Sequence, residues 1–261
     1  MKNLEELIEI VKILRSPNGC QWDREQNHKS LRANMLEEAY EAVDAIDDGD
    51  TKHLREELGD VLLQVVLHAQ IASDEGNFNL EDIAKEINEK LIRRHPHVFG
   101  EVQVNSTDEI LANWEKIKKG EKTHRTSVMD GVSRSQSALM SAQKISKKAV
   151  KVGFEWDCEK TLYDCVFSEI KEFQEACKTS TREHIEEEMG DILFAMVNLA
   201  RWNKLDAEQA LLKSNKKFIK RFKKMEKLAT KPLTEYSFEE FNELWKQAKL
   251  HVIARKEALA E

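Results

Sequence analysis

The chain has 261 residues, of which 41% are hydrophobic and 34% charged, and its net charge is −7. This length suits one large or two ordinary domains, while the longest apolar run, near residues 61–67, is far too short to cross a membrane. The start mixes acids with apolar residues, unlike a signal peptide, and the four cysteines show no paired spacing, so we expect a cytoplasmic protein with reduced thiols and no zinc site.

Apolar residues at helical spacing predict five helices in the first half of the chain, at about residues 2–15, 29–48, 51–75, 80–94 and 108–119. Polar breaks follow the second and third of these, where Gly49 and Gly76 are expected C-caps. Alternating runs typical of strands are scarce. Long helices with short connections predict an all-α protein built as antiparallel bundles.

The chain repeats itself, which indicates two homologous domains. Five blocks recur in the same order, three of them with an offset of 131 residues. They are NGCQWD and VGFEWD (18–23, 152–157), EEAYE and SEIKE (37–41, 168–172), EELGD and EEMGD (56–60, 187–191), NEKLIRR and NKKFIKR (88–94, 215–221), and WEKIK and WKQAK (114–118, 245–249). We predict domains at 1–120 and 138–261, joined by a polar linker at 121–137.

Acidic pairs three residues apart share one helix face, and two such pairs occur in each domain. Fifteen residues lie between the pairs, enough for one helix to turn back on the next, so all four carboxylates are expected to converge. The sets are Glu38, Glu41, Glu57 and Asp60, and then Glu169, Glu172, Glu188 and Asp191.

The apolar runs that follow Asp60 and Asp191 predict largely buried helices. A single acidic pair is more often a solvated helix face, but the duplication and the apolar context favour function here. Carboxylates near a core need cationic compensation, and Mg²⁺, which prefers oxygen ligands and works with phosphates, supplies it.

Basic residues recur at matching places and are candidate phosphate ligands. Residues 1–120 carry a net charge of −10 and the remainder +3, so phosphate meets less repulsion in the second half. Basic and acidic residues are interleaved, which argues against duplex nucleic acid. The candidates are Lys90 and Arg94 in the first domain and Lys217, Lys220 and Arg221 in the second.

EEAYE followed fifteen residues later by ELGD resembles the signature of the MazG family of nucleoside triphosphate pyrophosphohydrolases. GCQWDREQ at 19–26 and RRHPHVF at 93–99 are similar to further blocks of its tandem-domain members. The resemblance covers nearly the whole chain. It implies an all-α fold, Mg²⁺ dependence with Mn²⁺ as a substitute, hydrolysis of NTPs to NMP and pyrophosphate, and homodimers whose helices complete each other's sites.

Carried over by position, the resemblance assigns the eight acids above as metal ligands. It maps the family's nucleotide-binding stretch onto residues 217–221 and a nucleotide-contacting tryptophan onto Trp245. The second domain departs from the motif in one place, because Ser168 stands where the first domain has Glu37. The more basic surroundings still favour the second domain as the main active copy.

The expected reaction is attack of water on the α-phosphorus with pyrophosphate leaving. Glu172 and Glu188 are the candidates for orienting that water, and the sequence does not choose between them. A non-enzymatic helical interaction protein and a narrow dUTP or phosphoribosyl-ATP hydrolase are the alternatives. A di-iron bundle needs Glu-x-x-His on two helices, whereas EQNH at 25–28 has no second copy in the repeat, and the Gly-rich loop of P-loop NTPases is missing.

Overall fold

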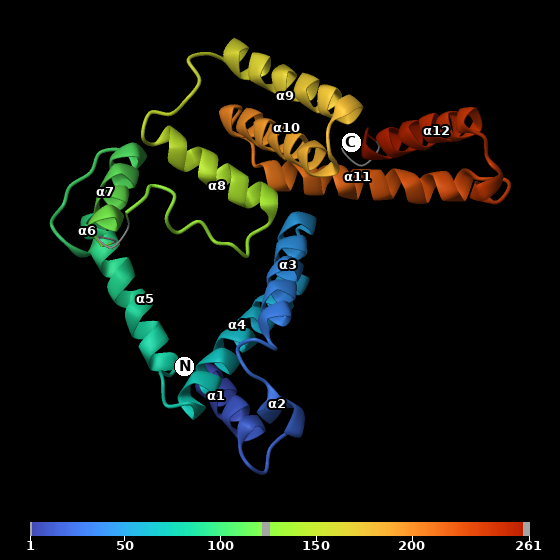
Figure 1. The fold of residues 1–261 in the computed structure, drawn as a ribbon. Helices are drawn as coiled ribbons and strands as arrows, with labels where there is room; N and C mark the ends of the chain where they lie inside the picture. Colours follow the sequence, from blue (N-terminus) through green and yellow to red (C-terminus); the bar gives the residue numbers. More distant parts are fainter. Residues whose placement is uncertain (1, 122–125, 258–261) are drawn as a thin grey trace. The chain divides into compact units, whose positions relative to one another are not determined.

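A computed structural model describes residues 2–121 and 126–257, and helices are the regular structure found in these two ranges (Figure 1). The chain divides into two compact units, Met1–Thr123 and His124–Glu261. The all-α prediction is therefore confirmed. Within the described ranges, no helix combines the length and the apolar character that crossing a membrane requires.

Unit one consists of seven helices in the described residues. They are α1 (Lys2–Arg15), α2 (Gln21–Glu25), α3 (Arg32–Asp48), α4 (Thr51–Asp74), α5 (Leu80–Arg94), α6 (Pro96–Phe99) and α7 (Thr107–Gly120). The five long helices match the predicted ranges closely. The short helices α2 and α6 were not predicted, because a single turn of helix has too few residues to display a periodic apolar face.

The turn between α3 and α4 brings the acidic segments together. Gly49 adopts the left-handed conformation (φ 69°) and ends α3, as its lack of a Cβ allows. Asp50 then caps α4 by accepting hydrogen bonds from the backbone N–H groups of Lys52 and His53. With only two residues between the helices, α4 runs back along α3 and the two pack side by side.

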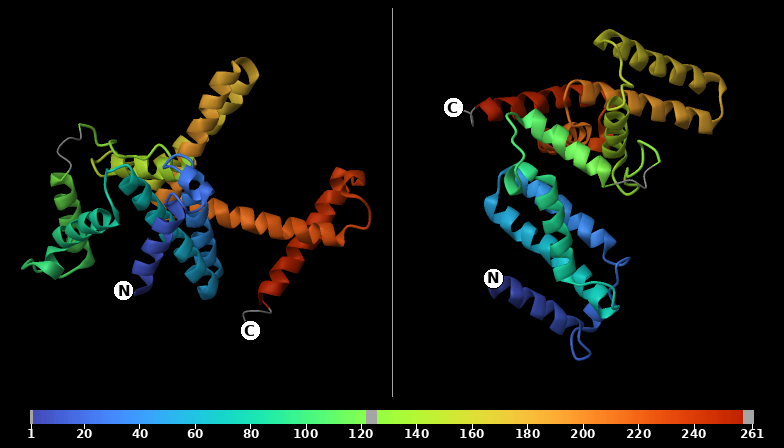
Figure 2. Two further views of the ribbon diagram at one scale, coloured as in Figure 1. Left: turned by 90° about the horizontal axis from the view of Figure 1, so that it is seen from below. Right: turned by 90° about the vertical axis from the view of Figure 1, so that its left-hand side faces the viewer.

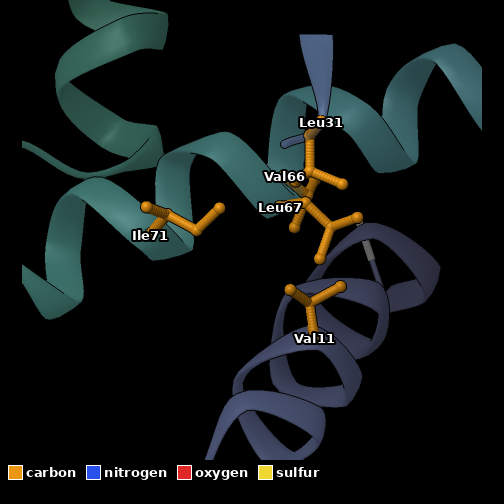
Figure 3. Close-up of a cluster of buried hydrophobic side chains, with 5 residues drawn as sticks. All are labelled: Val11, Leu31, Val66, Leu67 and Ile71. Carbon is orange, nitrogen blue, oxygen red and sulfur yellow. The ribbon is translucent and has the colours of Figure 1, made fainter. Parts of the chain in front are cut away.

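The core of unit one lies on the second half of α4 (Figure 3). There Val66, Leu67 and Ile71 pack against Val11 of α1 and Leu31, which precedes α3. All five side chains are buried. Fully burying such side chains contributes about 1.5–3 kcal/mol each, so this cluster holds α1, α3 and α4 in place.

Unit two repeats the arrangement with α8 (Ala138–Val150), α9 (Glu159–Thr179), α10 (Arg182–Trp202), α11 (Ala207–Leu228), the 3₁₀ turn η1 (Leu233–Glu235) and α12 (Phe238–Glu257). Helices α9 and α10 form an antiparallel hairpin equivalent to α3 and α4, and α11 packs with α12 (Figures 1 and 2). Met225, Leu244 and Ala248 make the core between α11 and α12.

The expectation that the helices after Asp60 and Asp191 are largely buried is confirmed for α4, whose second half carries the core of unit one, but it is met only in part on α10. An apolar stripe stays exposed on both helices, because Leu58 and Leu62 on α4 are 54% and 40% exposed and Leu193 and Met196 on α10 are 53% and 48% exposed. The physical reason is that each hairpin packs on one side only, so the opposite apolar stripe has no covering layer within its own unit. Both stripes occupy equivalent places in the two units.

Candidate metal and nucleotide site

Two clusters of three carboxylates lie at equivalent positions in the two helical hairpins. In unit one, α3 supplies Glu38 and Glu41 and α4 supplies Glu57, with their oxygen ligand atoms within 4.8 Å of one another. In unit two, α9 supplies Glu169 and Glu172 and α10 supplies Glu188, with the same spread. Each cluster thus joins two helices, as the predicted hairpin requires.

The fourth acid of each set lies outside the cluster, so the expected convergence of four carboxylates is reduced to three. Asp60 and Asp191 remain close enough to act electrostatically. The pKa of Glu38 is raised, first by burial and then by the charge of Asp60. The pKa of Glu169 is raised by burial, then by Glu172 and Asp191. Like charges gathered in this way favour proton uptake or a bound cation.

Glu57 is the buried member of the first cluster, with a residue exposure of 7%. Burial and the charge of Glu41 raise its pKa, and its buried Oε2 atom has no hydrogen-bond partner in the described parts of the chain. A buried carboxylate oxygen without a partner is costly. An oxygen-preferring divalent cation held by Glu38, Glu41 and Glu57 would satisfy it, so the donor set fits Mg²⁺.

The other members are more open than the sequence suggested. Glu41, Glu172 and Asp191 are exposed, whereas Glu169 and Glu188 are intermediate. Water and a phosphate chain can therefore reach both clusters from solvent. This exposure arises because the outer side of each hairpin is uncovered within its unit.

Two histidines next to the clusters were not predicted. His53 Nε2 lies 2.8 Å from Glu57 Oε1, and His184 Nε2 lies 3.6 Å from Glu188 Oε1. Each histidine precedes its glutamate by one helical turn. Their separation of 131 residues equals the offset of the acidic blocks, and that coincidence is the signal that could have identified them.

The departure from the repeat at Ser168 has a structural consequence. Ser168 Oγ donates a hydrogen bond to Glu172 Oε1 over 2.7 Å. One turn earlier, the Cys165 thiol lies 3.8 Å from Glu169 Oε1, and burial with the nearby acids raises the pKa of this thiol. Ser168 therefore supports a cluster carboxylate, whereas an acid at this position would repel it.

The two arginines at the end of α5 are paired with an acid. Arg94 donates from Nη2 to Glu121 Oε2 at 2.6 Å, and Arg93 donates from Nε to Glu121 Oε1 at 2.6 Å. These hydrogen bonds lower the pKa of Glu121 to about 2. The Arg94 guanidinium also lies 5.4 Å from the ring centroid of Trp114. A phosphate at Arg94 would have to displace Glu121, and Lys90 is half-buried beside it on α5.

The equivalent residues of unit two are unpaired within the described chain. Lys217 and Lys220 are exposed, Arg221 is intermediate, and no ion pair joins any of the three to another described residue. The buried Nε of Arg221 has no hydrogen-bond partner there. Trp245 stacks at a tilt on Phe218, with ring centroids 5.1 Å apart, against the Met225 core. Its predicted nucleotide contact stays a prediction.

The structure does not bring the acidic clusters and the basic residues into direct contact within one unit. In the described ranges, no ion pair links Lys217, Lys220 or Arg221 to the carboxylates of α9 and α10, and none links Lys90 or Arg94 to those of α3 and α4. Glu25 and His28 belong to no carboxylate or histidine cluster with metal-ligand spacing in the described residues, and His28 Nδ1 lies 2.7 Å from His68 Nδ1.

Comparisons with known proteins agree on one family. The model of the MazG nucleotide pyrophosphohydrolase domain matches twice, at residues 26–99 and 158–225. The nucleoside triphosphate pyrophosphohydrolase/pyrophosphatase MazG of Thermotoga maritima is 47% identical over 249 residues, covering 94% of this chain and 95% of that protein. The nucleoside triphosphate pyrophosphohydrolase of Escherichia coli is 43% identical over 257 residues, covering 95% and 98%. The uncharacterized protein YabN of Bacillus subtilis is 49% identical over 92% of this chain and 50% of its own length.

Proposed function

The chain belongs to the MazG family of nucleotide pyrophosphohydrolases, and from this premise we propose that it hydrolyses NTPs and dNTPs broadly to NMP and pyrophosphate in a Mg²⁺-dependent reaction. It is an enzyme of the phosphoric anhydride hydrolase class. The observation that carries the proposal is the duplicated cluster of three glutamates, in which the buried Glu57 Oε2 has no protein partner in the described chain.

The glutamates of each cluster would hold the cation, with Asp60 or Asp191 adding negative charge at its edge. Bound there, Mg²⁺ would supply charge neutralisation for the triphosphate and polarise the reacting phosphoryl group, and Mn²⁺ is the natural substitute. The protein residues then have two tasks, which are to orient the triphosphate and to hold a water in line with the α-phosphorus.

Glu172 is the residue that we assign to the water. It is exposed, and Ser168 holds its Oε1, so its other oxygen can accept a proton from a water arriving from solvent. Glu188 is less exposed and has His184 beside it, which suits a ligand fixed in one orientation. In this scheme pyrophosphate leaves from the side opposite the water.

We assign the main activity to unit two because its three candidate phosphate ligands form no ion pair with another residue that the structure describes. Lys217, Lys220 and Arg221 would neutralise the β- and γ-phosphates, and Trp245 would lie next to the nucleoside. In unit one the Arg94 guanidinium is already engaged by Glu121. Charge-assisted contacts to phosphate need a donor that is free to make them.

A homodimer would complete the sites. The exposed apolar stripes of α4 and α10, which include Leu58, Leu62, Leu193 and Met196, suit a second copy of the chain as their cover. That copy would also bring lysine and arginine side chains to carboxylates that no lysine or arginine pairs with in the described single chain. The four cysteines are all free, which supports a cytoplasmic enzyme.

The test is a panel of NTPs, dNTPs, dUTP and phosphoribosyl-ATP incubated with the purified protein and Mg²⁺, scored for NMP and pyrophosphate. We expect pyrophosphate from most nucleotides and none after chelation of the metal. Release of inorganic phosphate with NDP would contradict α–β cleavage. Activity on one nucleotide alone would favour a narrow hydrolase, and none on any would favour a non-enzymatic protein.

A further inference from the structure

We propose that His53 and His184 are positioning residues for the metal clusters. Each would hold one carboxylate oxygen of the α4 or α10 glutamate and leave the other oxygen for the cation. The proposal rests on the function proposed above and adds two residues to it. The carboxylates that hold metal ions are commonly oriented by a second hydrogen-bonding partner of this kind.

Helix capping places the two histidines identically. Asp50 caps α4, and its side chain accepts from the backbone N–H of His53. Thr181 caps α10, and its side chain accepts from the backbone N–H of His184. In both helices the histidine is therefore the third residue after the cap, with its backbone fixed. The cluster glutamate follows four residues later, on the same helix face.

In unit one, the two carboxylate oxygens of Glu57 have different surroundings. His53 Nε2 lies 2.8 Å from Oε1, whereas the buried Oε2 has no hydrogen-bond partner in the described residues. The glutamate side chain is only 9% exposed, so burial and the histidine together restrict its rotamer. The unpartnered oxygen belongs to a side chain that points into the cluster with Glu38 and Glu41.

The contact in unit two is looser. His184 Nε2 lies 3.6 Å from Glu188 Oε1, while its Nδ1 lies 3.5 Å from Glu187 Oε2. The imidazole thus stands between two acids. We therefore expect a smaller effect at this cluster than at the first one.

Ordinary surface pairs in the same hairpin differ from these contacts. Lys171 and Glu175 on α9 are also four residues apart, but their side chains are 76% and 62% exposed. In the histidine pairs one partner is sheltered, at 9% for Glu57 and 13% for Glu188. A pair with one fixed, sheltered partner can orient a ligand, which a pair of two mobile side chains cannot.

The experiment measures Mn²⁺ affinity of the full chain by calorimetry and by the electron paramagnetic resonance signal of the bound ion. Glu188→Gln isolates the first cluster and Glu57→Gln isolates the second. In the Glu188→Gln variant we expect the additional change His53→Ala to weaken Mn²⁺ binding about tenfold. His53→Gln, whose amide can donate from the same position, should restore most of that loss. His184→Ala should weaken the second cluster by less than about tenfold, because its contact with Glu188 is looser.

Lys12→Ala and Lys171→Ala serve as matched controls, because each removes an exposed pair with a glutamate. Neither should change Mn²⁺ affinity, and melting temperatures measured without metal check that every variant is folded. Unchanged affinity in His53→Ala, or no rescue by His53→Gln, would overturn the positioning role. If both His53→Ala and Glu57→Gln leave the Mn²⁺ stoichiometry of the chain unchanged, the metal site of the proposed function fails as well as the role of His53. If Glu57→Gln loses a bound Mn²⁺ and His53→Ala does not change the affinity, only the role of His53 is overturned.

Discussion

The two units carry the same three glutamates in the same hairpin, yet their surroundings differ. In unit one the Arg94 guanidinium is held by Glu121, and the pKa of that carboxyl falls to about 2. In unit two Arg221 pairs with no acid in the described chain, and Ser168 supports Glu172 where unit one has Glu37. The two copies thus keep the same cluster of glutamates but differ in the positive charge that is free to contact a phosphate.

The largest difference between the units should appear when one glutamate of each cluster loses its charge. We expect Glu188→Gln to lower pyrophosphate release at least about a hundredfold, because a cation ligand next to the reacting phosphate is lost. Glu57→Gln should retain most of the activity. Steady-state rates with one NTP measure both variants, and the reverse pattern would assign the activity to unit one.

Substitutions of the basic residues should give a smaller difference between the two units, and this difference should appear in KM. Arg221→Ala is expected to raise KM for the nucleotide about tenfold, since a charge-assisted phosphate contact contributes about 1.5–3 kcal/mol. Arg94→Ala should change KM less than about twofold, because Glu121 already occupies the guanidinium. Equal KM values for the two variants would show that both sites bind substrate alike.

The serine that breaks the repeat offers a finer comparison. Ser168→Ala removes the hydrogen bond to Glu172, and a net contribution of about 0.5–1.5 kcal/mol corresponds to a loss in kcat of about twofold to tenfold. The corresponding Glu37→Ala in unit one should leave kcat unchanged. An undiminished kcat in Ser168→Ala would remove Glu172 from the role of orienting the water.

The smallest effect concerns pH. Because the folded-state pKa of Glu121 is about 2 and its ordinary value is 4.5, its ion pairs stabilise unit one fully above pH 4.5 and are lost as the pH falls towards 2. Thermal melts across that range should show a decline of a few degrees that is absent in Glu121→Gln. Glu101→Gln, which changes an exposed acid of the same unit, should melt as the parent protein does.

Much of the fold was predictable because long helices display their periodicity. The hairpin α3–α4 follows from apolar spacing and from the turn at Gly49, and the hairpin α9–α10 follows from the repeat of the acidic blocks. The clusters of Glu38, Glu41 and Glu57 and of their equivalents follow because residues on one helix face must meet residues on the returning helix. The duplication shows which acidic residues of the two halves correspond, and a single copy would not give this information.

Other features depend on contacts that local patterns do not encode. Glu121 lies in the polar stretch that reads as linker, and only the packing of α5 with α7 brings it to Arg94. The exposure of Leu193 and Met196 is likewise invisible in sequence, because an apolar stripe indicates only that some surface covers it, without identifying that surface. The histidines were missed because an isolated His one turn from an acid is commonplace.

The unpartnered Oε2 of Glu57 also bears on how unit one folds. An anionic oxygen enclosed by protein makes the empty hairpin less stable than its apolar core alone would allow. An ion that binds only the folded hairpin lowers the free energy of that state by RT ln(1 + [L]/Kd). If the cluster of unit one holds Mg²⁺ as proposed, the free Mg²⁺ concentration would help to set the melting temperature of this unit whether or not this copy ever turns over a nucleotide. The cation would then be a structural component of the hairpin as well as a reagent.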